Sequence, residues 1–186
     1  MTDKQKTILQ ATLELVAEYG LTGTTIALIA KRAQASPGII YHYFASKDEI
    51  IATLYAQIET EFVEALLAEQ VLGLPWSERM PRLFLKTFDH FVEHPLALSF
   101  HEQYKNSAYH KIDDETAGDG VMAPLARALQ DDIAHGLIRD WPLHVIYAMT
   151  AGVAISLARV QHAGVVTLSR TMLESIAAAC CHSIQT

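Results

Sequence analysis

Apolar residues recur at helical spacing along most of the chain, and residues that cap or break helices separate these segments at helix-length intervals. Alternating runs of β-branched residues, which would indicate strands, do not occur. In the N-terminal part the pattern predicts helices over residues 3–19, 24–34, 36–44 and 46–70. Gly20 ends the first of these helices, while Ser36 and Ser46 are placed to cap the third and fourth.

The rest of the chain also predicts only helices. They cover residues 76–93, 96–109, 114–136, 142–162 and 167–183, with Pro95 and Gly164 among the residues that separate them. The stretch around Gly118 and Gly120 is weakly helical, so a loop there would split the third of these helices. The pattern therefore predicts an all-α protein, and we place a domain boundary after residue 47, giving domains of residues 1–47 and 48–186.

Composition favours a globular intracellular protein. Of the 186 residues, 51% are hydrophobic and 19% are charged, which supplies a core and excludes a disordered chain. The two cysteines, Cys180 and Cys181, are adjacent and cannot form a disulfide framework. No apolar leader follows the polar N-terminus, and the longest apolar stretch, 145–158, is shorter than the about 20 residues of a membrane span. We expect a soluble, cytoplasmic protein with no membrane partner.

Charge is distributed unevenly along the chain. The formal net charge of −7 argues against a general nucleic-acid binder. Residues 1–47 nevertheless hold five basic and three acidic side chains, whereas the remainder holds 9 basic and 18 acidic ones. A basic N-terminal part on an acidic body suits a protein that offers one face to a polyanion, although chance unevenness would look the same.

Residues 24–48 have the spacing of a helix-turn-helix, with one helix, a tight turn and a short second helix. Small or polar residues in and beside the second helix suit contact with a DNA backbone: Ser36, Gly38, Tyr41 and Lys47. A three-helix bundle that uses the tight turn only for packing is the alternative interpretation. The motif therefore favours a DNA-binding protein.

These residues resemble the N-terminal signature of the TetR/AcrR bacterial transcriptional repressors. The matching positions are Thr24, Thr25, Ile29, Ala30, Ala33, Ser36, Gly38, Ile40, Tyr41, Phe44, Ser46 and Lys47, with Asp48 and Glu49 following. The rest of the chain is similar to the family only in length, helical punctuation and an apolar C-terminal helix pair. The resemblance implies a three-helix DNA-binding domain with a helix-turn-helix, joined to a helical-bundle domain for ligand binding and dimerisation.

The resemblance also implies roles for individual residues. The expected DNA-binding set contains three phosphate contacts and five residues at the start or on the groove side of the recognition helix: Thr25, Tyr41 and Lys47, then Ser36, Pro37, Gly38, Ile39 and His42. This recognition helix lacks Arg, Lys, Asn and Gln, the side chains that make bidentate base contacts. Base readout is then expected to depend on thymine methyl groups, His42 and DNA shape.

The last two predicted helices indicate a homodimer. The helix over 142–162 is apolar nearly all round, and the helix over 167–183 carries the small residues 177–181. A helix that is apolar on every side needs partners on every side, which a symmetry mate or the interior of a monomer would supply. The resemblance implies a dimer through this helix pair, and two-fold symmetry predicts a near-palindromic operator in double-stranded DNA.

Aromatic and methionine residues gather in the middle of the chain, where the resemblance implies a site for a small apolar or amphipathic effector. The candidate ligand-binding residues, for each of which core packing is the alternative, are Phe62, Phe84, Phe88, Phe91, Phe100, His101, Tyr104 and Met122. The implied function is a transcriptional regulator and not an enzyme, a repressor that its effector releases from DNA. An activator or a corepressor-type switch fits the residues equally well, and the sequence names no operator, effector or regulated gene.

Other classes of function are kept as alternatives. His90 and His94 have zinc-ligand spacing on one helix face and His101 follows, which would suit a helical metal-binding protein or an enzyme. We expect solvated or core histidines, with no metal and no cofactor, because the predicted helix ends directly after His94. A second alternative is an interaction protein that uses the fold without DNA. Cys180 and Cys181 could sense thiol-reactive agents, but buried filler residues are the expectation.

Overall fold

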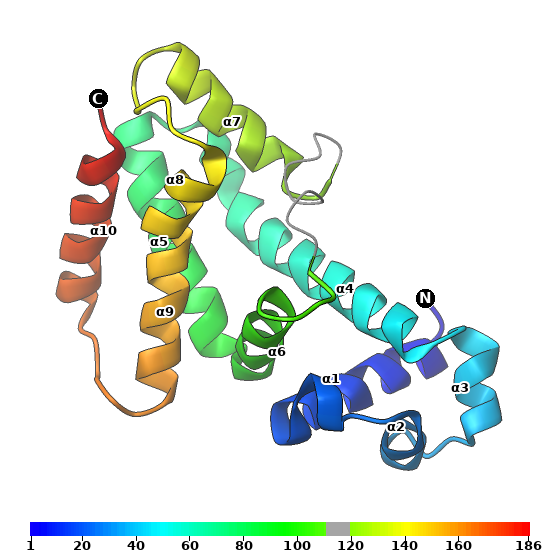
Figure 1. The fold of residues 1–186 in the computed structure, drawn as a ribbon. Coiled ribbons are helices and arrows are strands. Elements are labelled where there is room, and N and C mark those ends of the chain that lie inside the picture. Colours follow the sequence, from blue (N-terminus) through cyan, green and yellow to red (C-terminus); the bar gives the residue numbers. More distant parts are fainter. Residues whose placement is uncertain (111–119) are drawn as a thin grey trace. The chain divides into compact units, whose positions relative to one another are not determined.

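A computed structural model describes residues 1–110 and 120–186, and within these ranges the chain folds into helices (Figure 1). The one strand-like feature there is an isolated bridge between Ile138 and Gln185. The predicted all-α fold is confirmed. Contacts divide the chain into two compact units. The first holds Met1–Glu59 and the segment that begins at Leu96, and the second holds Thr60–Pro95 and residues 120–186.

The first unit is built from five helical segments. They are α1 (Asp3–Gly23), α2 (Ile26–Arg32), α3 (Pro37–Tyr43), the first part of α4 (Lys47–Leu67), and α6 (Pro95–Lys105). Hydroxyl groups of Thr25, Ser36 and Ser46 accept hydrogen bonds from backbone N–H groups in the first turns of α2, α3 and α4. These caps satisfy donors that a helix start leaves unpaired, and the sequence analysis predicted those of Ser36 and Ser46.

Apolar side chains from these helices form one core in the first unit. Members that are at most 4% exposed include Ile8, Leu15, Ile29, Ile40, Ile50, Leu54, Ile58 and Phe100. Burying a side chain of this size contributes about 1.5–3 kcal/mol, so the core fixes α2 and α3 on their neighbours. Because α4 and α6 supply part of this core, the first unit extends past residue 47, and the boundary placed there stays a prediction.

Gln103 of α6 fastens a bend near the end of α1. Gly20 has a φ of 74°, in the left-handed region that favours glycine. The side-chain oxygen of Gln103 accepts from the N–H of Leu21 at 3.0 Å, and its amide nitrogen donates to the carbonyl of Val16 at 3.1 Å. A Cβ at position 20 would lie 3.3 Å from the Gln103 oxygen, so both backbone conformation and space favour glycine.

The second unit surrounds α5. It contains the end of α4, η1 (Ala68–Gly73), α5 (Trp76–Glu93), α7 (Ala123–Ala134), α8 (Leu143–Met149), α9 (Ala151–His162) and α10 (Arg170–Ile184). Figure 1 shows α9 and α10 beside α5, and both pack against it. Phe84, Phe88 and Phe91 share one face of α5 and are at most 3% exposed, so this face anchors the unit.

One predicted helix, over residues 142–162, is broken in the structure. α8 and α9 meet at Thr150, whose φ of −123° and ψ of −88° are not helical. The Thr150 hydroxyl donates to the carbonyl of Ile146 at 2.7 Å, a bond to the preceding turn that bends helices. A Cβ on Gly152 would lie 3.3 Å from the carbonyl oxygen of Tyr147, so glycine permits the close approach after the break.

Two other helices end earlier than predicted. α4 ends at Leu67, because Glu69 and Gln70 have φ values of 64° and 53° in the 3₁₀ segment η1. Lys86 donates to the carbonyls of Ala65 and Ala68 at 3.3 and 3.4 Å, which satisfies acceptors that a longer helix would have paired. α6 ends at Lys105. The helix predicted from residue 114 is described only from α7 onward, and part of the predicted 118–120 loop lies outside the described residues.

Candidate DNA-binding surface and effector pocket

The turn between α2 and α3 depends on local backbone geometry. Gln34 has a φ of 48°, and the N–H of Ala35 donates to the carbonyl of Ala30 at 2.9 Å. Ser36 then caps α3, and Pro37 occupies its first turn, where a missing N–H costs nothing. Since α2 packs on α1 and also contacts α3, this turn sets the direction of α3 as in a helix-turn-helix.

The predicted DNA-binding residues are exposed on this motif, with one exception. Exposed side chains or backbone occur at Thr25, Ser36, Pro37, Gly38, Ile39, Tyr41 and His42. Tyr41 is 56% exposed and Ile39 is 40% exposed, although both are large and partly apolar. The opposite side of α3 is buried, because Ile40 is 0% exposed and Phe44, directly after the helix, is 3% exposed. α3 therefore has a core face and a free face.

Lys47 is the exception because it is half-buried. Its Nζ donates to the carbonyl oxygen of Leu21, which holds the start of α4 against the end of α1. An ammonium group has three donors, so this bond does not use up the capacity of Lys47 for a phosphate. The structure thus gives Lys47 a packing role that the sequence did not predict.

Arg32 offsets acidic side chains of α1. Its two terminal nitrogens lie 3.1 Å from a carboxylate oxygen of Glu14 and 2.9 Å from one of Glu18. The hydrogen bonds that Arg32 donates to these carboxylates raise the pKa of Arg32, and the one to Glu18 lowers the pKa of Glu18. Such exposed pairs stabilise the fold little. The two ion pairs do, however, reduce the electrostatic repulsion between these carboxylates and a polyanion that approaches the first unit.

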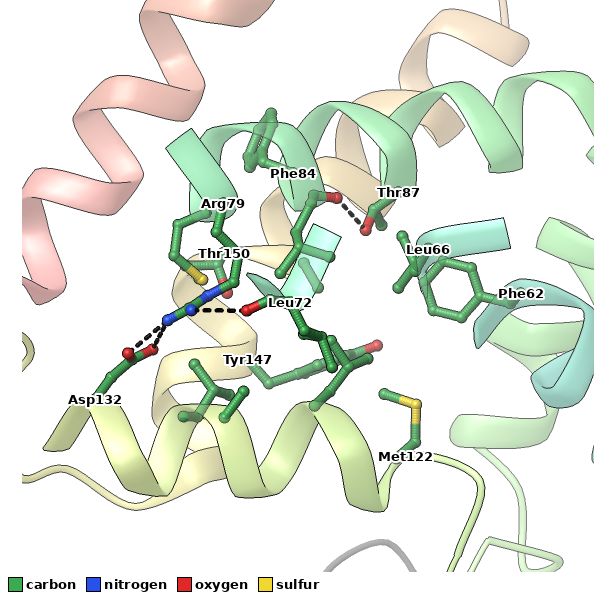
Figure 2. Close-up of a pocket in the computed structure, with 16 residues that line it drawn as sticks. Phe62, Leu66, Leu72, Arg79, Phe84, Thr87, Met122, Asp132, Tyr147 and Thr150 are labelled. Carbon is green, nitrogen blue, oxygen red and sulfur yellow. Dashed lines mark hydrogen bonds and ion pairs between the residues drawn. The ribbon is translucent and has the colours of Figure 1, made fainter. Parts of the chain in front are cut away.

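The second unit contains an apolar pocket with a cavity volume of about 90 Å³ (Figure 2). Its walls come from α4, η1, α5, α7, α8, Thr150 and the first residue of α9. Three of the predicted ligand-binding residues line it: Phe62, Phe84 and Met122. Figure 2 shows Phe62 and Met122 toward one end and Arg79 with Asp132 at the other. Its apolar lining with a few polar groups is typical of small-ligand sites, but its volume is below their usual range of about 300–1,000 Å³.

The other five predicted ligand-binding residues do not line this pocket. Two are buried elsewhere along α5, and three belong to α6 in the first unit: Phe88 and Phe91, then Phe100, His101 and Tyr104. In that unit the Tyr104 ring stacks on Tyr55 with centroids 3.8 Å apart. Burial, followed by the charges of Lys105 and His110, lowers the pKa of His101 to about 3.

Arg79 and Asp132 form the polar end of the pocket, and the sequence analysis missed both. Nη2 of Arg79 donates to both carboxylate oxygens of Asp132, and Nη1 donates to the carbonyls of Leu72 and Leu74 at 3.3 and 3.2 Å. Arg79 is 9% exposed and Asp132 is 5% exposed. Tyr147, Thr87 and Thr150 are the other polar lining residues.

A sequence signal for this ion pair exists. Arg79 is spaced at i, i+4 and i+8 with Leu83 and Thr87, on the buried side of α5, and Asp132 follows Leu125, Ala128 and Leu129 at helical spacing. Charged residues are rarely buried unless they are paired. Two opposite charges on two apolar helix faces therefore indicate a buried pair.

Of the three histidines behind the metal-site alternative, His90 and His94 are neighbours in the second unit, and His101 belongs to the first. The rings of His90 and His94 lie 4.7 Å apart, and burial followed by the charge of His94 lowers the pKa of His90 to about 4. Within the part of the chain that the structure describes, no group of three or more His, Cys, Asp or Glu side chains could hold a metal ion.

The adjacent Cys180 and Cys181 lie on α10, and burial makes their thiols weakly nucleophilic. Burial, followed by its neighbour Cys180, raises the pKa of the Cys181 thiol to about 11, and burial also raises the pKa of Cys180. The thiolate is the reactive form of cysteine, so both side chains are poorly nucleophilic at neutral pH.

The C-terminal helix pair leaves much apolar surface uncovered. Leu143–His162 is long and apolar enough to cross a membrane by length and composition, yet only 28% of its apolar stretch is buried. Val145 is 41% exposed and Met172 of α10 is 50% exposed. An apolar surface of this kind on a globular protein marks an interaction site.

Comparisons with known proteins agree with this arrangement. Residues 8–54 match a family model described as bacterial regulatory proteins, tetR family, and residues 75–185 match one described as tetracyclin repressor-like, C-terminal domain. The regulator BetI 1 of Chromohalobacter salexigens is 39% identical over 71 residues, which are 38% of this chain and 35% of that protein. BetI of Escherichia coli is 35% identical over 80 residues, 43% of this chain and 40% of that protein. The matches thus span well under half of these relatives.

Solved structures resemble the whole chain. A TetR family transcription regulator from Marinobacter aquaeolei aligns with a TM-score of 0.88 at 21% identity, covering 98% of this chain and 95% of that one. The TetR-family regulator HI0893 from Haemophilus influenzae aligns with a TM-score of 0.84 at 23% identity, covering 99% and 97%. At such identities the likeness concerns the fold.

Proposed function

Because this chain belongs to the tetR family of bacterial regulatory proteins, we propose that it is a sequence-specific DNA-binding transcriptional regulator. The observation that carries the proposal is the free face of α3, where Ile40 is buried while Ile39, Tyr41 and His42 are exposed. In helix-turn-helix proteins a helix presented this way enters the major groove. The family indicates a regulator rather than an enzyme.

The proposed DNA contacts fall into two groups. Thr25, Tyr41 and Lys47 hold phosphates and set the position of the protein on the duplex. The surface that faces the bases is the start and free face of α3: Ser36, Pro37, Gly38, Ile39 and His42. Because this surface offers no bidentate side chain, each half-site is bound with modest specificity, and a second protomer supplies much of the affinity.

We place the dimer interface on residues 142–162 and 167–183. The exposed apolar surface at Val145 and Met172 supports this, since covering it contributes about 25 cal/mol for each Å² removed from water. A homodimer joined through these helices carries two copies of α3, one for each half-site of a duplex. The operator is then near-palindromic, with half-sites spaced by whole turns of DNA.

The pocket of the second unit is the proposed effector site, and the regulator is a repressor that its effector releases. α4 supplies Phe62 and Leu66 to the pocket and Ile50 and Leu54 to the core beneath the helix-turn-helix. An effector that binds better to one position of α4 shifts the population toward that position and changes the affinity for DNA. The regulator acts in the cytoplasm, where its DNA is, without a membrane partner.

The experiment that tests the DNA-binding proposal selects fragments of the source genome with the purified protein. The best fragment is expected to contain a near-palindrome, and the logarithm of its affinity should fall linearly with the logarithm of salt concentration. A folded dimer that enriches no fragment at low salt, alone or with cell extract as a source of corepressor, would contradict the proposal. It would favour an interaction protein that works without DNA.

A matched pair of tyrosines sharpens this test. Tyr41 and Tyr19 are 56% and 57% exposed, but only Tyr41 lies in the proposed DNA contact set. Tyr41→Phe removes two hydroxyl–phosphate bonds from a dimer, each contributing about 1 kcal/mol, so operator affinity should fall about tenfold or more. Tyr19→Phe should leave it unchanged. Equal effects of the two changes would contradict the assignment of Tyr41.

A further inference from the structure

The pocket in the second unit has a wall made almost wholly of hydrocarbon, and its two charged residues are paired with each other. Among its described lining residues, full charges occur only on Arg79 and Asp132. The hydroxyl of Thr87 donates to the carbonyl of Leu83 at 2.8 Å, and that of Thr150 donates to the carbonyl of Ile146 at 2.7 Å. These polar groups are engaged within their own helices.

The Arg79 guanidinium is held from both sides. Nη2 donates to both oxygens of Asp132 on α7, while Nη1 donates to the carbonyls of Leu72 and Leu74 at the end of η1. A charged ligand would have to replace one of these partners to be neutralised. Removing one partner of a buried ion pair leaves an uncompensated charge, which is strongly unfavourable. The pair therefore closes the charged end of the pocket instead of offering a counter-ion.

From this geometry we infer that the effector is a small uncharged molecule with a mostly hydrocarbon surface and at most one six-membered ring. The inference rests on the proposed function, because it concerns the effector site of that regulator. An anion or cation entering the pocket would lose its hydration and meet no free countercharge among the described lining residues, whereas a neutral apolar molecule loses little. The cavity of about 90 Å³ sets this upper limit, since even a larger engineered apolar cavity of about 150 Å³ takes up a single benzene ring.

The test uses three probes that share a ring and differ in charge at neutral pH: benzyl alcohol, benzoate and benzylammonium. Their affinities are measured by calorimetry and by the rise in the midpoint of thermal unfolding, which follows from ligand binding to the folded state. Benzyl alcohol is expected to bind at least about tenfold more tightly than either ion. Equal or tighter binding of an ion to the natural protein would overturn the inference, as would no binding of any probe at millimolar concentration.

Asp132→Asn should change the charge preference. The change keeps the size of the side chain but removes its negative charge, so Arg79 becomes a cation without a counter-ion. Benzoate affinity is expected to rise at least about tenfold, while benzylammonium affinity does not rise. Asp131, the exposed neighbour on α7, provides the matched control. Asp131→Asn should leave all three affinities unchanged, and an equal gain of benzoate binding there would overturn the assignment.

Two further variants keep the inference testable if Asp132→Asn does not fold. The double change of Arg79→Met with Asp132→Leu replaces the pair by apolar groups and should still bind benzyl alcohol and exclude both ions. Ala128→Phe fills the pocket and should abolish benzyl alcohol binding, whereas Ala134→Phe, at an exposed position of the same helix, should not. Retained binding in Ala128→Phe would place the probe elsewhere and overturn the inference.

DNA binding is measured on the same preparations without any probe. If the operator is bound with steep salt dependence but the probes show no charge preference, the inference fails and the DNA-binding proposal is kept. If the probes behave as expected but no DNA is bound, the pocket assignment is kept and the proposed function fails.

Discussion

The buried His101 should make the free energy of unfolding depend on pH. Its pKa in the folded protein is about 3, against 6.5 for an unperturbed histidine, because burial and the nearby charges of Lys105 and His110 disfavour the imidazolium. Below pH 6.5 the unfolded chain takes up a proton that the folded chain does not. The contribution of His101 to stability is therefore complete above pH 6.5 and is lost as the pH falls from 6.5 toward 3.

The magnitude follows from this interval. Each pH unit between the two pKa values corresponds to about 1.36 kcal/mol, so lowering the pH from 7.5 to 5.0 should cost about 2 kcal/mol through His101 alone. The effect is not diluted by solvent, because the side chain belongs to a residue only 5% exposed. Urea unfolding at the two pH values, at one fixed protein concentration, gives the total pH dependence from all groups.

His101→Phe isolates the contribution of this side chain. The variant keeps a ring in the stack near Tyr55 and Tyr104 but cannot take up a proton. The loss of stability between pH 7.5 and 5.0 should be smaller by about 2 kcal/mol in the variant than in the natural protein. The same change at the exposed His162 should leave the loss as it is. A His101→Phe protein with the natural pH dependence would refute the assignment of a buried, neutral His101.

Three other predictions follow from contacts described above. Arg79→Met leaves Asp132 as an unpaired buried charge and should lower the free energy of unfolding by about 3–5 kcal/mol, whereas adding Asp132→Leu should restore most of it. Urea unfolding measures both, and additive losses would contradict the pairing. Lys47→Met should reduce the slope of log affinity against log salt by about 0.9 for each protomer, as measured by fluorescence anisotropy with operator DNA. An unchanged slope would leave Lys47 with its packing role alone. Val145→Glu places a charge in the proposed dimer interface and should give monomers in sedimentation equilibrium; a dimer of natural affinity would locate the interface elsewhere.

The sequence predicted the N-terminal unit well, because its features are local. Ser36 and Ser46 precede helices as caps, and Ile40 and Phe44, which match the family signature, are buried. The path of the chain from α2 to α3 follows from such neighbours along the sequence. The sequence did not predict the hydrogen bond from Lys47 to the carbonyl of Leu21, because the two positions are 26 residues apart.

The second unit was harder to predict, because tertiary contacts decide its details. Neither proline nor glycine occupies position 150, so the break in the helix over 142–162 gave no signal of the usual kind; it follows from the Thr150 hydroxyl and the glycine two residues later. The pocket shows the same limit. Phe62 and Met122 were selected for their type, but Phe88 and Phe91 share that type and lie away from the cavity. Which of these residues line the cavity is decided only by how α7 and η1 pack against α5.

The contacts of Gln103 limit how segments can be recombined between related regulators. The side chain of Gln103 binds the N–H of Leu21 and the carbonyl of Val16, which precede it by 82 and 87 residues. A hybrid that takes residues 1–47 from this chain and the remainder from a relative would pair the Gly20 bend with a foreign side chain. Carrying α6 across as well keeps the contact. A gene that transfers the DNA-binding unit with this contact intact thus needs three crossovers, after residue 47 and on each side of α6, instead of one.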